Sequence, residues 1–131
     1  MAQDKCMEGQ VLAVTGAGRG IGREIALLAA SEGASVVVND LGGSPDGDGE
    51  DLGPAQAVVD EIRAASGKAV ANGASVADPE GANSIIKAAI ENFGRIDSVV
   101  NNAGILRDRI FHRMSAVDFE MVIKVHLFGA F

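Results

Sequence analysis

The sequence predicts an α/β fold in which parallel β-strands alternate with α-helices, and three observations lead to that prediction. Four short apolar runs are continuous rather than alternating, as in strands that are buried on both faces of a sheet. Helical patterns, with apolar residues three or four positions apart, separate these runs. A glycine-rich turn joins the first run to the first helix. Strands that alternate with helices in this way are parallel and are joined by right-handed crossovers.

The expected strands are Val11–Val14, Val36–Val38, Ala69–Ala71 and Val99–Val100. One helix is expected after each of the first three strands. The apolar positions of the first are Ile21, Ile25 and Leu28, and those of the second are Val58, Val59, Ile62 and Ala65. The apolar positions of the third are Ile85, Ile86, Ala89, Ile90 and Phe93. Glycines mark the helix ends near Gly33, Gly67 and Gly94. The third helix also has a clear start, because Asp78 is a good N-cap and Pro79 suits the first helical position.

The segment Leu41–Pro54 interrupts this pattern. It contains five glycines, two prolines and four acidic residues. We expect a mobile, acidic surface loop rather than a linker between domains, because the alternation of strands and helices resumes after it.

The last segment, Ser115–Phe131, is expected to form one helix that is apolar on nearly every side. One stripe consists of Phe119, Val122, Ile123, Leu127 and Ala130, and Met121, Val125 and Phe128 cover much of the rest. Such a helix is expected to be buried on several sides. Because a strand–helix unit takes roughly 30 residues, 131 residues hold about four units, fewer than an open parallel sheet of six strands needs. We therefore expect residues 1–131 to be the N-terminal portion of one larger domain, with no second domain present.

The composition excludes several functional classes. The net charge is −7, whereas proteins that bind duplex DNA or anionic membranes normally present a basic face, so we expect neither partner. The single cysteine, Cys6, cannot form an internal disulfide, and no Cys/His cluster has zinc spacing, so no metal is expected. No apolar run approaches the roughly 18 residues of a membrane span, and no secretory signal is visible, which predicts a cytoplasmic protein.

The strongest motif is the segment Thr15–Gly22, TGAGRGIG, between a buried strand and an amphipathic helix. Glycines allow the backbone to turn tightly and to approach a pyrophosphate. The helix that begins near Gly20 offers unpaired N–H groups and the positive end of its dipole to phosphates. The alternative is a tight turn that needs glycine for packing alone. The context favours a dinucleotide-binding sheet of the Rossmann type.

An acidic residue stands where such a site recognises the adenosine ribose. Asp40 ends the second strand and lies 24 residues after Gly16, close to the roughly 20 expected. A carboxylate there can accept hydrogen bonds from both ribose hydroxyls and repels a 2′-phosphate, so NAD is favoured over NADP. Arg19 argues in the other direction, because a guanidinium in this turn could meet a phosphate. The alternative role for Asp40 is that of a turn residue beside Gly42 and Gly43.

A second motif, NNAG at Asn101–Gly104, follows the fourth strand at the carboxyl end of the predicted sheet. Paired asparagine side chains can bond to neighbouring backbone, and the Ala-Gly pair leaves room for a cofactor. Alone, this segment could be an Asx turn. Its place beside the point where the strand order switches favours a ligand site.

With both motifs in place, the sequence resembles the short-chain dehydrogenase/reductase family over essentially its whole length. The segments VVVNDLGG, EIRAASGKAVAN and NNAGILRDR are similar to (3R)-hydroxyacyl-CoA dehydrogenases, both those within type 2 peroxisomal multifunctional enzymes and their bacterial single-domain relatives. The resemblance implies strand order 3-2-1-4, continuing into later strands that are missing here. It also implies NAD-dependent interconversion of a hydroxyl and a ketone, an acyl-CoA substrate, a homodimer or homotetramer, and a peroxisomal location in a eukaryote.

The resemblance assigns cofactor-binding residues by position. Those assigned to the pyrophosphate are Gly16, Arg19, Gly20, Ile21 and Gly22, and the one assigned to the ribose is Asp40. The residues assigned to the adenine are Ser75 and Val76. The residues assigned to the nicotinamide half are Asn102, Ala103 and Gly104.

Two positions depart from the family pattern. Ala74 stands where the family usually has an aspartate that meets the adenine amino group, so adenine contacts are expected to be weaker or to come from backbone. His126 stands where the wider family has a catalytic asparagine that organises a water in a proton relay, which makes it the one catalytic candidate of this chain. Its place on the apolar stripe is more typical of a histidine that only completes a core.

The family's catalytic serine and its Tyr-x-x-x-Lys motif belong beyond Phe131, and this sequence contains no tyrosine. The chain by itself is therefore expected to be inactive. One alternative is a non-catalytic dinucleotide-binding or interaction module of natural length. Another is a reductase of the same family that acts on oxoacyl carriers or steroids. In the loop after NNAG, the basic residues could meet acyl-CoA phosphates or simply face solvent; they are Arg107, Arg109, His112 and Arg113.

Overall fold

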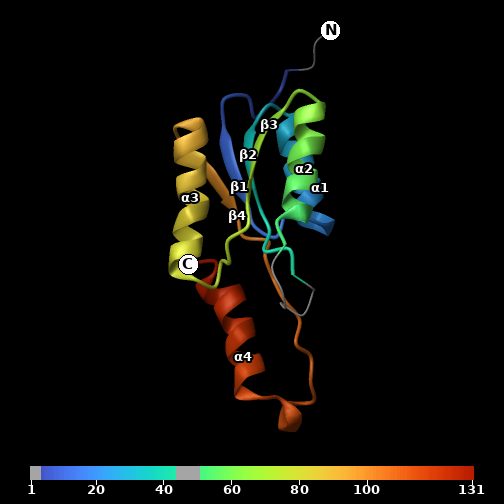
Figure 1. The fold of residues 1–131 in the computed structure, drawn as a ribbon, viewed down its shortest axis with the longest axis vertical. Helices are drawn as coiled ribbons and strands as arrows, with labels where there is room; N and C mark the ends of the chain where they lie inside the picture. The colour runs from blue at the N-terminus through green and yellow to red at the C-terminus, as the bar shows by residue number, and fades with distance from the viewer. Residues whose placement is uncertain (1–3, 44–50) are drawn as a thin grey trace.

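The computed structural model describes residues 4–43 and 51–131 and contains one four-stranded parallel sheet between helices (Figure 1). In chain order the elements are β1 Val11–Val14, α1 Gly20–Ser31, β2 Ser35–Asn39, α2 Gly53–Ala64, β3 Lys68–Asn72, α3 Pro79–Phe93, β4 Ser98–Val100 and α4 Ala116–Ile123. A 3-10 helix, Phe111–Arg113, precedes α4, and a π-helix, Lys124–Phe128, follows it. None of the described helices is long and apolar enough to cross a membrane.

The strand order is β3-β2-β1-β4, as the sequence predicted. Helices α1 and α2 cover one face of the sheet and α3 covers the other, which gives the layered arrangement of a Rossmann-like fold (Figure 1). The order switches at β1, which pairs with β2 on one side and with β4 on the other. The loops that leave the carboxyl ends of these three strands therefore meet at one end of the sheet.

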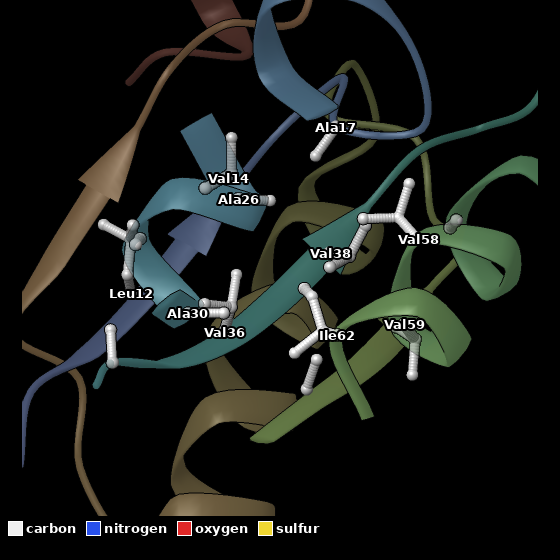
Figure 2. Packing of buried hydrophobic residues seen from close by; sticks show 14 residues of the cluster. Leu12, Val14, Ala17, Ala26, Ala30, Val36, Val38, Val58, Val59 and Ile62 are labelled. Atoms are coloured by element: carbon white, nitrogen blue, oxygen red, sulfur yellow. The ribbon is translucent and has the colours of Figure 1, made fainter. Parts of the chain in front are cut away.

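Residues of β1 and β2 point alternately into two cores. On one face, Val14, Val36 and Val38 pack with the inner faces of α1 and α2 (Figure 2). On the other face, Ala13 and Val37 pack against α3. The prediction of strands buried on both faces holds for β1 and β2. It is wrong for β4, whose Val99 is 44% exposed, and only partly right for β3, where Ala69 is buried but Val70 and Ala71 are half-buried, because these two are the edge strands of the described sheet.

The predicted helix ends agree closely with the structure. Asp78 caps α3, since its Oδ2 accepts the Gly81 N–H at 2.8 Å. Gly94 ends the same helix in the left-handed conformation, with φ at 80°. The α2 helix, in contrast, begins at Gly53, inside the segment that the sequence assigned to a loop. Pro54 explains the difference, because proline is well suited to the first turn of a helix; residues 44–50 of that predicted loop lie outside the described part.

The expected single helix over Ser115–Phe131 is instead an α-helix followed by a π-helix. Ser115 caps α4 by accepting the Asp118 N–H at 3.0 Å. The π turn is closed by the Gly129 N–H, which donates to the Lys124 carbonyl at 2.8 Å. The expectation that this segment is buried on several sides is wrong for the described chain. In it the helix projects from the sheet (Figure 1), and Val125 is the one buried residue of α4 and the π-helix.

Asp97 stabilises the start of the central strand in a pH-dependent way. Its side chain pairs with Arg95, and its Oδ2 accepts the Val11 N–H at 2.8 Å; these contacts lower the pKa of Asp97 below its ordinary value of 3.8. A carboxyl group whose pKa is lower in the folded than in the unfolded protein increases the free energy of unfolding. This contribution is fully present at pH values above the unfolded-state pKa and is lost as the pH falls through the folded-state pKa. Urea unfolding of Asp97→Asn is therefore expected to show lower stability at pH 7 and a flatter loss of stability below about pH 4 than wild type. Parallel curves for the two proteins would contradict this role.

Candidate dinucleotide-binding site

The site lies where the carboxyl ends of β1, β2, β3 and β4 approach the amino end of α1. A cleft of about 260 Å³ opens there. Its lining residues are Gly16, Arg19, Asn39, Asp40, Leu41, Gly43, Ala74, Ser75, Val76, Asn102, Ala103, Gly104, Ile105 and Val125. Every loop that follows a strand of the sheet contributes to this lining, so the site is a product of the parallel topology.

The glycine-rich turn is packed directly against the NNAG segment. Gly16 has φ at 63°, and a Cβ there would lie 2.9 Å from the Ala103 Cα. At Gly22 a Cβ would lie 2.4 Å from the Gly16 carbonyl oxygen and 2.5 Å from Asn102 Nδ2. The first N–H groups of α1 have no partner within the helix, so this end of α1 presents donors and a positive dipole toward the cleft.

The buried hydroxyl of Thr15 joins the two motifs. Its Oγ1 accepts the N–H groups of Asn102 and Ala103, at 3.1 and 3.0 Å, and donates to the Val100 carbonyl at 3.3 Å. The Asn102 side chain completes the connection by donating to the Thr15 and Gly16 carbonyls, both at 3.1 Å. The expectation that an asparagine of NNAG bonds to neighbouring backbone is met by Asn102, and its partner is the glycine-rich turn.

Asp40 is held at the edge of the same cleft. Its Oδ2 accepts the Gly18 N–H at 2.8 Å, and its Oδ1 accepts the Gly42 N–H at 2.7 Å. Each carboxylate oxygen keeps further lone pairs for a ligand. Arg19 lies nearby, where its Nη2 donates to the Gly42 carbonyl at 3.1 Å. The carboxylate and the guanidinium thus both fix the start of the loop after β2.

The wall of the cleft opposite the glycine-rich turn is formed by Ala74, Ser75 and Val76, which follow β3. The Ala74 N–H donates to Asn72 Oδ1 at 3.0 Å, and the Ala74 carbonyl accepts from Asn39 Nδ2 at 2.9 Å. Because the Ala74 N–H is already occupied, it is not available to adenine. The expectation that backbone supplies an adenine contact here is therefore not met by the N–H of Ala74.

His126 lies next to the cleft rather than in it. It lines a small adjoining cavity with Val76 and Ala103. Its Nε2 is 3.1 Å from the Ile105 nitrogen and 3.0 Å from the Ile105 oxygen. A Cβ on Gly104 would come within 2.7 Å of the imidazole, so the ring packs against that glycine. The placement of His126 in a core is wrong: the residue is exposed, and the π turn directs its ring to the Ile105 backbone.

The structure brings most of the predicted cofactor-binding residues together. Those that line the cleft are Gly16, Arg19, Asp40, Ser75, Val76, Asn102, Ala103 and Gly104. Three lie outside its lining: Gly20 and Ile21 are exposed at the start of α1, and Gly22 is buried beneath the turn. Sequence reasoning missed Asn39 and Leu41; the available signal for Asn39 was an asparagine that ends an otherwise apolar strand.

The basic segment after the cleft has an internal partner. Arg107 Nη1 lies 3.2 Å from Asp118 Oδ1 in α4. The hydrogen bond from the Ser115 hydroxyl lowers the pKa of Asp118, and Arg107 lowers it further to a smaller extent.

In the described part of the chain no group of three His, Cys, Asp or Glu side chains is arranged to hold a metal ion.

Comparison with known proteins identifies the family. The model of the short chain dehydrogenase family matches residues 10–131. The chain belongs to this family. A crystal structure of a short chain dehydrogenase from Mycobacterium avium superposes with a TM-score of 0.84 at 53% identity, covering 94% of this chain and 42% of the other. That agreement confirms the predicted Rossmann-like fold.

Two curated relatives give the breadth of this short-chain dehydrogenase family. The peroxisomal multifunctional enzyme type 2 of Mus musculus is 52% identical over 131 residues, which are 100% of this chain and 17% of the enzyme. A 3-oxoacyl-[acyl-carrier-protein] reductase of Synechocystis is 44% identical over 122 residues, which are 93% of this chain and 46% of the reductase. The chain thus spans less than half the length of each. Both similarities confirm the groups that the sequence resembled.

Proposed function

We propose that this chain is the cofactor-binding part of an NAD-dependent oxidoreductase that interconverts a secondary hydroxyl and a ketone. The observation behind the proposal is the arrangement of Asp40. Its carboxylate is held by two backbone N–H groups at the edge of a cleft that also contains the glycine-rich turn and the NNAG segment. Short-chain dehydrogenases work with NAD or NADP, and the grouping of these residues around one cleft supports the binding of such a dinucleotide.

The residues fit a dinucleotide along the length of the cleft. The N–H groups that begin α1 would hold the pyrophosphate, and the absence of a side chain at Gly16 leaves the turn close to NNAG. Asp40 would accept hydrogen bonds from the ribose of the adenosine half. The backbone of Asn102 to Gly104 would flank the nicotinamide half. When bound, the nicotinamide supplies the hydride chemistry, and the protein supplies binding, orientation and exclusion of water.

Asp40 favours NAD over NADP in this proposal. A 2′-phosphate would approach its carboxylate, and two like charges at close range repel. Arg19 is the group that could offset this repulsion. Its Nη2 donates to the Gly42 carbonyl, so part of its hydrogen-bonding capacity is used within the protein. The balance supports NAD.

The substrate part of the proposal rests on similarity. The similarity to a peroxisomal multifunctional enzyme supports a 3-hydroxyacyl-CoA-type substrate, and the similarity to an acyl-carrier-protein reductase supports the alternative of an oxoacyl carrier. Because these 131 residues contain no tyrosine, we propose that the chain alone binds cofactor without turnover.

His126, bonded to the Ile105 backbone beside the nicotinamide end, is the proposed contributor to a proton relay. The exposed apolar side chains of α4 support a homo-oligomer.

The test uses the protein at its natural length, isolated from its source. Calorimetric titration is expected to show that NADH binds at least about tenfold more tightly than NADPH. The reason is that one close contact between like charges commonly weakens binding by a factor of about ten or more. Oxidation of 3-hydroxyacyl-CoA with NAD is then compared with reduction of 3-oxoacyl carrier protein with NADPH. Tighter binding of NADPH would refute the cofactor assignment. Binding of NADH without turnover of either substrate would favour the non-catalytic module.

A further inference from the structure

Asn39 is a buried polar residue at the end of the apolar strand β2, and its amide nitrogen is fully engaged. The residue is 2% exposed. Its Nδ2 lies 2.9 Å from Asn72 Oδ1, 2.9 Å from the Ala74 carbonyl and 3.3 Å from the Asn72 carbonyl. Three acceptors around one terminal atom fix which end of the carboxamide is NH₂. The side chain thus holds β2, β3 and the wall Ala74–Val76 together.

The opposite end of this carboxamide, Oδ1, is an acceptor without a donor. No described residue donates a hydrogen bond to it. Yet among the described residues no fully buried side-chain nitrogen or oxygen lacks a partner, so Oδ1 must retain contact with open space. Asn39 lines the cleft, which is therefore the space that this oxygen reaches. A buried side chain with one unpaired acceptor facing a cavity is suited to receive a hydrogen bond from a ligand.

The position of Asn39 along the cleft determines which part of a ligand it meets. The start of α1 marks the pyrophosphate position, and Asp40 marks the adjacent ribose. The base attached to that ribose extends toward the remaining wall, which consists of Leu41, Ala74, Ser75 and Val76. Ala74 contributes only a methyl group there, and its N–H already donates to Asn72. Among the described residues of this part of the cleft, Asn39 offers the buried side-chain acceptor, Oδ1, that receives no hydrogen bond.

We infer that Asn39 Oδ1 accepts a hydrogen bond from the exocyclic amino group of the adenine base and so selects adenine in place of hypoxanthine. Asn39 is then both a ligand contact, through Oδ1, and the support of the wall behind the base, through Nδ2. This inference rests on the proposed dinucleotide function. It assigns to a strand residue the recognition that an aspartate at position 74 would otherwise provide.

The experiment compares NADH with the reduced hypoxanthine analogue, which has a carbonyl in place of the amino group, by calorimetric titration of the natural-length protein. Wild type is expected to bind NADH about tenfold more tightly, because the analogue loses one hydrogen bond and places two acceptors together. In Asn39→Ala both affinities are expected to fall and their ratio to approach one. In the matched variant Asn72→Ala, which loosens the same wall but keeps Asn39 Oδ1, both affinities fall and the tenfold ratio remains.

The ratio separates recognition from a merely structural role. Equal affinity of wild type for the two nucleotides would overturn the inference, as would a tenfold ratio that persists in Asn39→Ala. If Asn39→Ala does not fold, Asn39→Ser retains one donor for the wall but removes the carboxamide oxygen, and its shorter side chain leaves no acceptor at the position of Oδ1, so the same loss of ratio is expected. Failure of wild type to bind either nucleotide would refute the proposed function itself, and the inference with it.

Discussion

Replacement of Gly22 by alanine is expected to destabilise the protein by about 3 kcal/mol and to abolish NADH binding. In an exposed helix the same change would normally stabilise by up to about 1 kcal/mol, because glycine is a poor helix former. Here the added Cβ would lie 2.4 Å from the Gly16 carbonyl oxygen and 2.5 Å from Asn102 Nδ2. The glycine-rich turn and NNAG would have to separate. Urea unfolding and NADH titration measure the two effects.

Gly53→Ala is the matched control for this substitution. Gly53 also lies in the first turn of a helix, and a Cβ there would meet only the exposed Asp51 carboxylate, at 3.1 Å or more. We expect little change in stability or in NADH affinity. If Gly22→Ala behaved like Gly53→Ala, the close packing of the turn against Asn102 would not be the basis of the site.

Asp40→Ala is expected to weaken NADH binding by about 10- to 100-fold, since hydrogen bonds to a charged group contribute about 1.5–3 kcal/mol. The carboxylate is expected to act twice: it meets the ribose, and it orients the backbone of Gly18 and Gly42. NADPH binding is expected to weaken much less, because the repulsion of its 2′-phosphate disappears at the same time. Titration with both nucleotides measures the change in preference.

Asp60→Ala provides the comparison for net charge. Asp60 is exposed on α2, where its Oδ1 accepts a hydrogen bond from Gln56, and it does not line the cleft. Its replacement by alanine therefore removes one negative charge without changing the cleft. Both affinities are expected to stay within about twofold of wild type, because Asp60 does not line the cleft and salt screens interactions between exposed charges. An NADH-to-NADPH ratio in Asp40→Ala that matched Asp60→Ala would refute the ribose assignment.

Local patterns in the sequence were sufficient to predict the framework of the sheet. Val11–Val14 is an uninterrupted apolar run, and its boundaries match β1 because a strand that is buried on both faces consists mostly of apolar residues. Gly94 and Asp78 end and begin α3 through local backbone and side-chain chemistry that needs no distant partner. The exposure of β4, in contrast, depends on which strand lies beyond it, and no pattern within Ser98–Val100 records that.

The site was predictable in its motifs and less so in its contacts. The acidic residue after β2 and the glycine-rich turn stand at fixed positions in the sequence, so Asp40 and Gly16 could be found. The bonds from Asp40 to Gly18 and Gly42 depend on how two loops meet, which spacing alone does not reveal. Asn39 resembles an ordinary strand end, and its role becomes visible only when Asn72 and Ala74 are seen around it.

The π turn makes the number of residues near the end of the chain as important as their identity. A hydrogen bond from Gly129 to Lys124 spans five residues, one more than an α-helical turn. Removing Val125 would restore the α-helical repeat, and the side chains after the deletion would rotate by about 100° relative to those of α4. The imidazole of His126 would then leave the Ile105 backbone, although the histidine was still present. Substitution and deletion thus have different consequences here, because the number of residues in the turn, rather than any one neighbouring side chain, determines the direction in which the imidazole points.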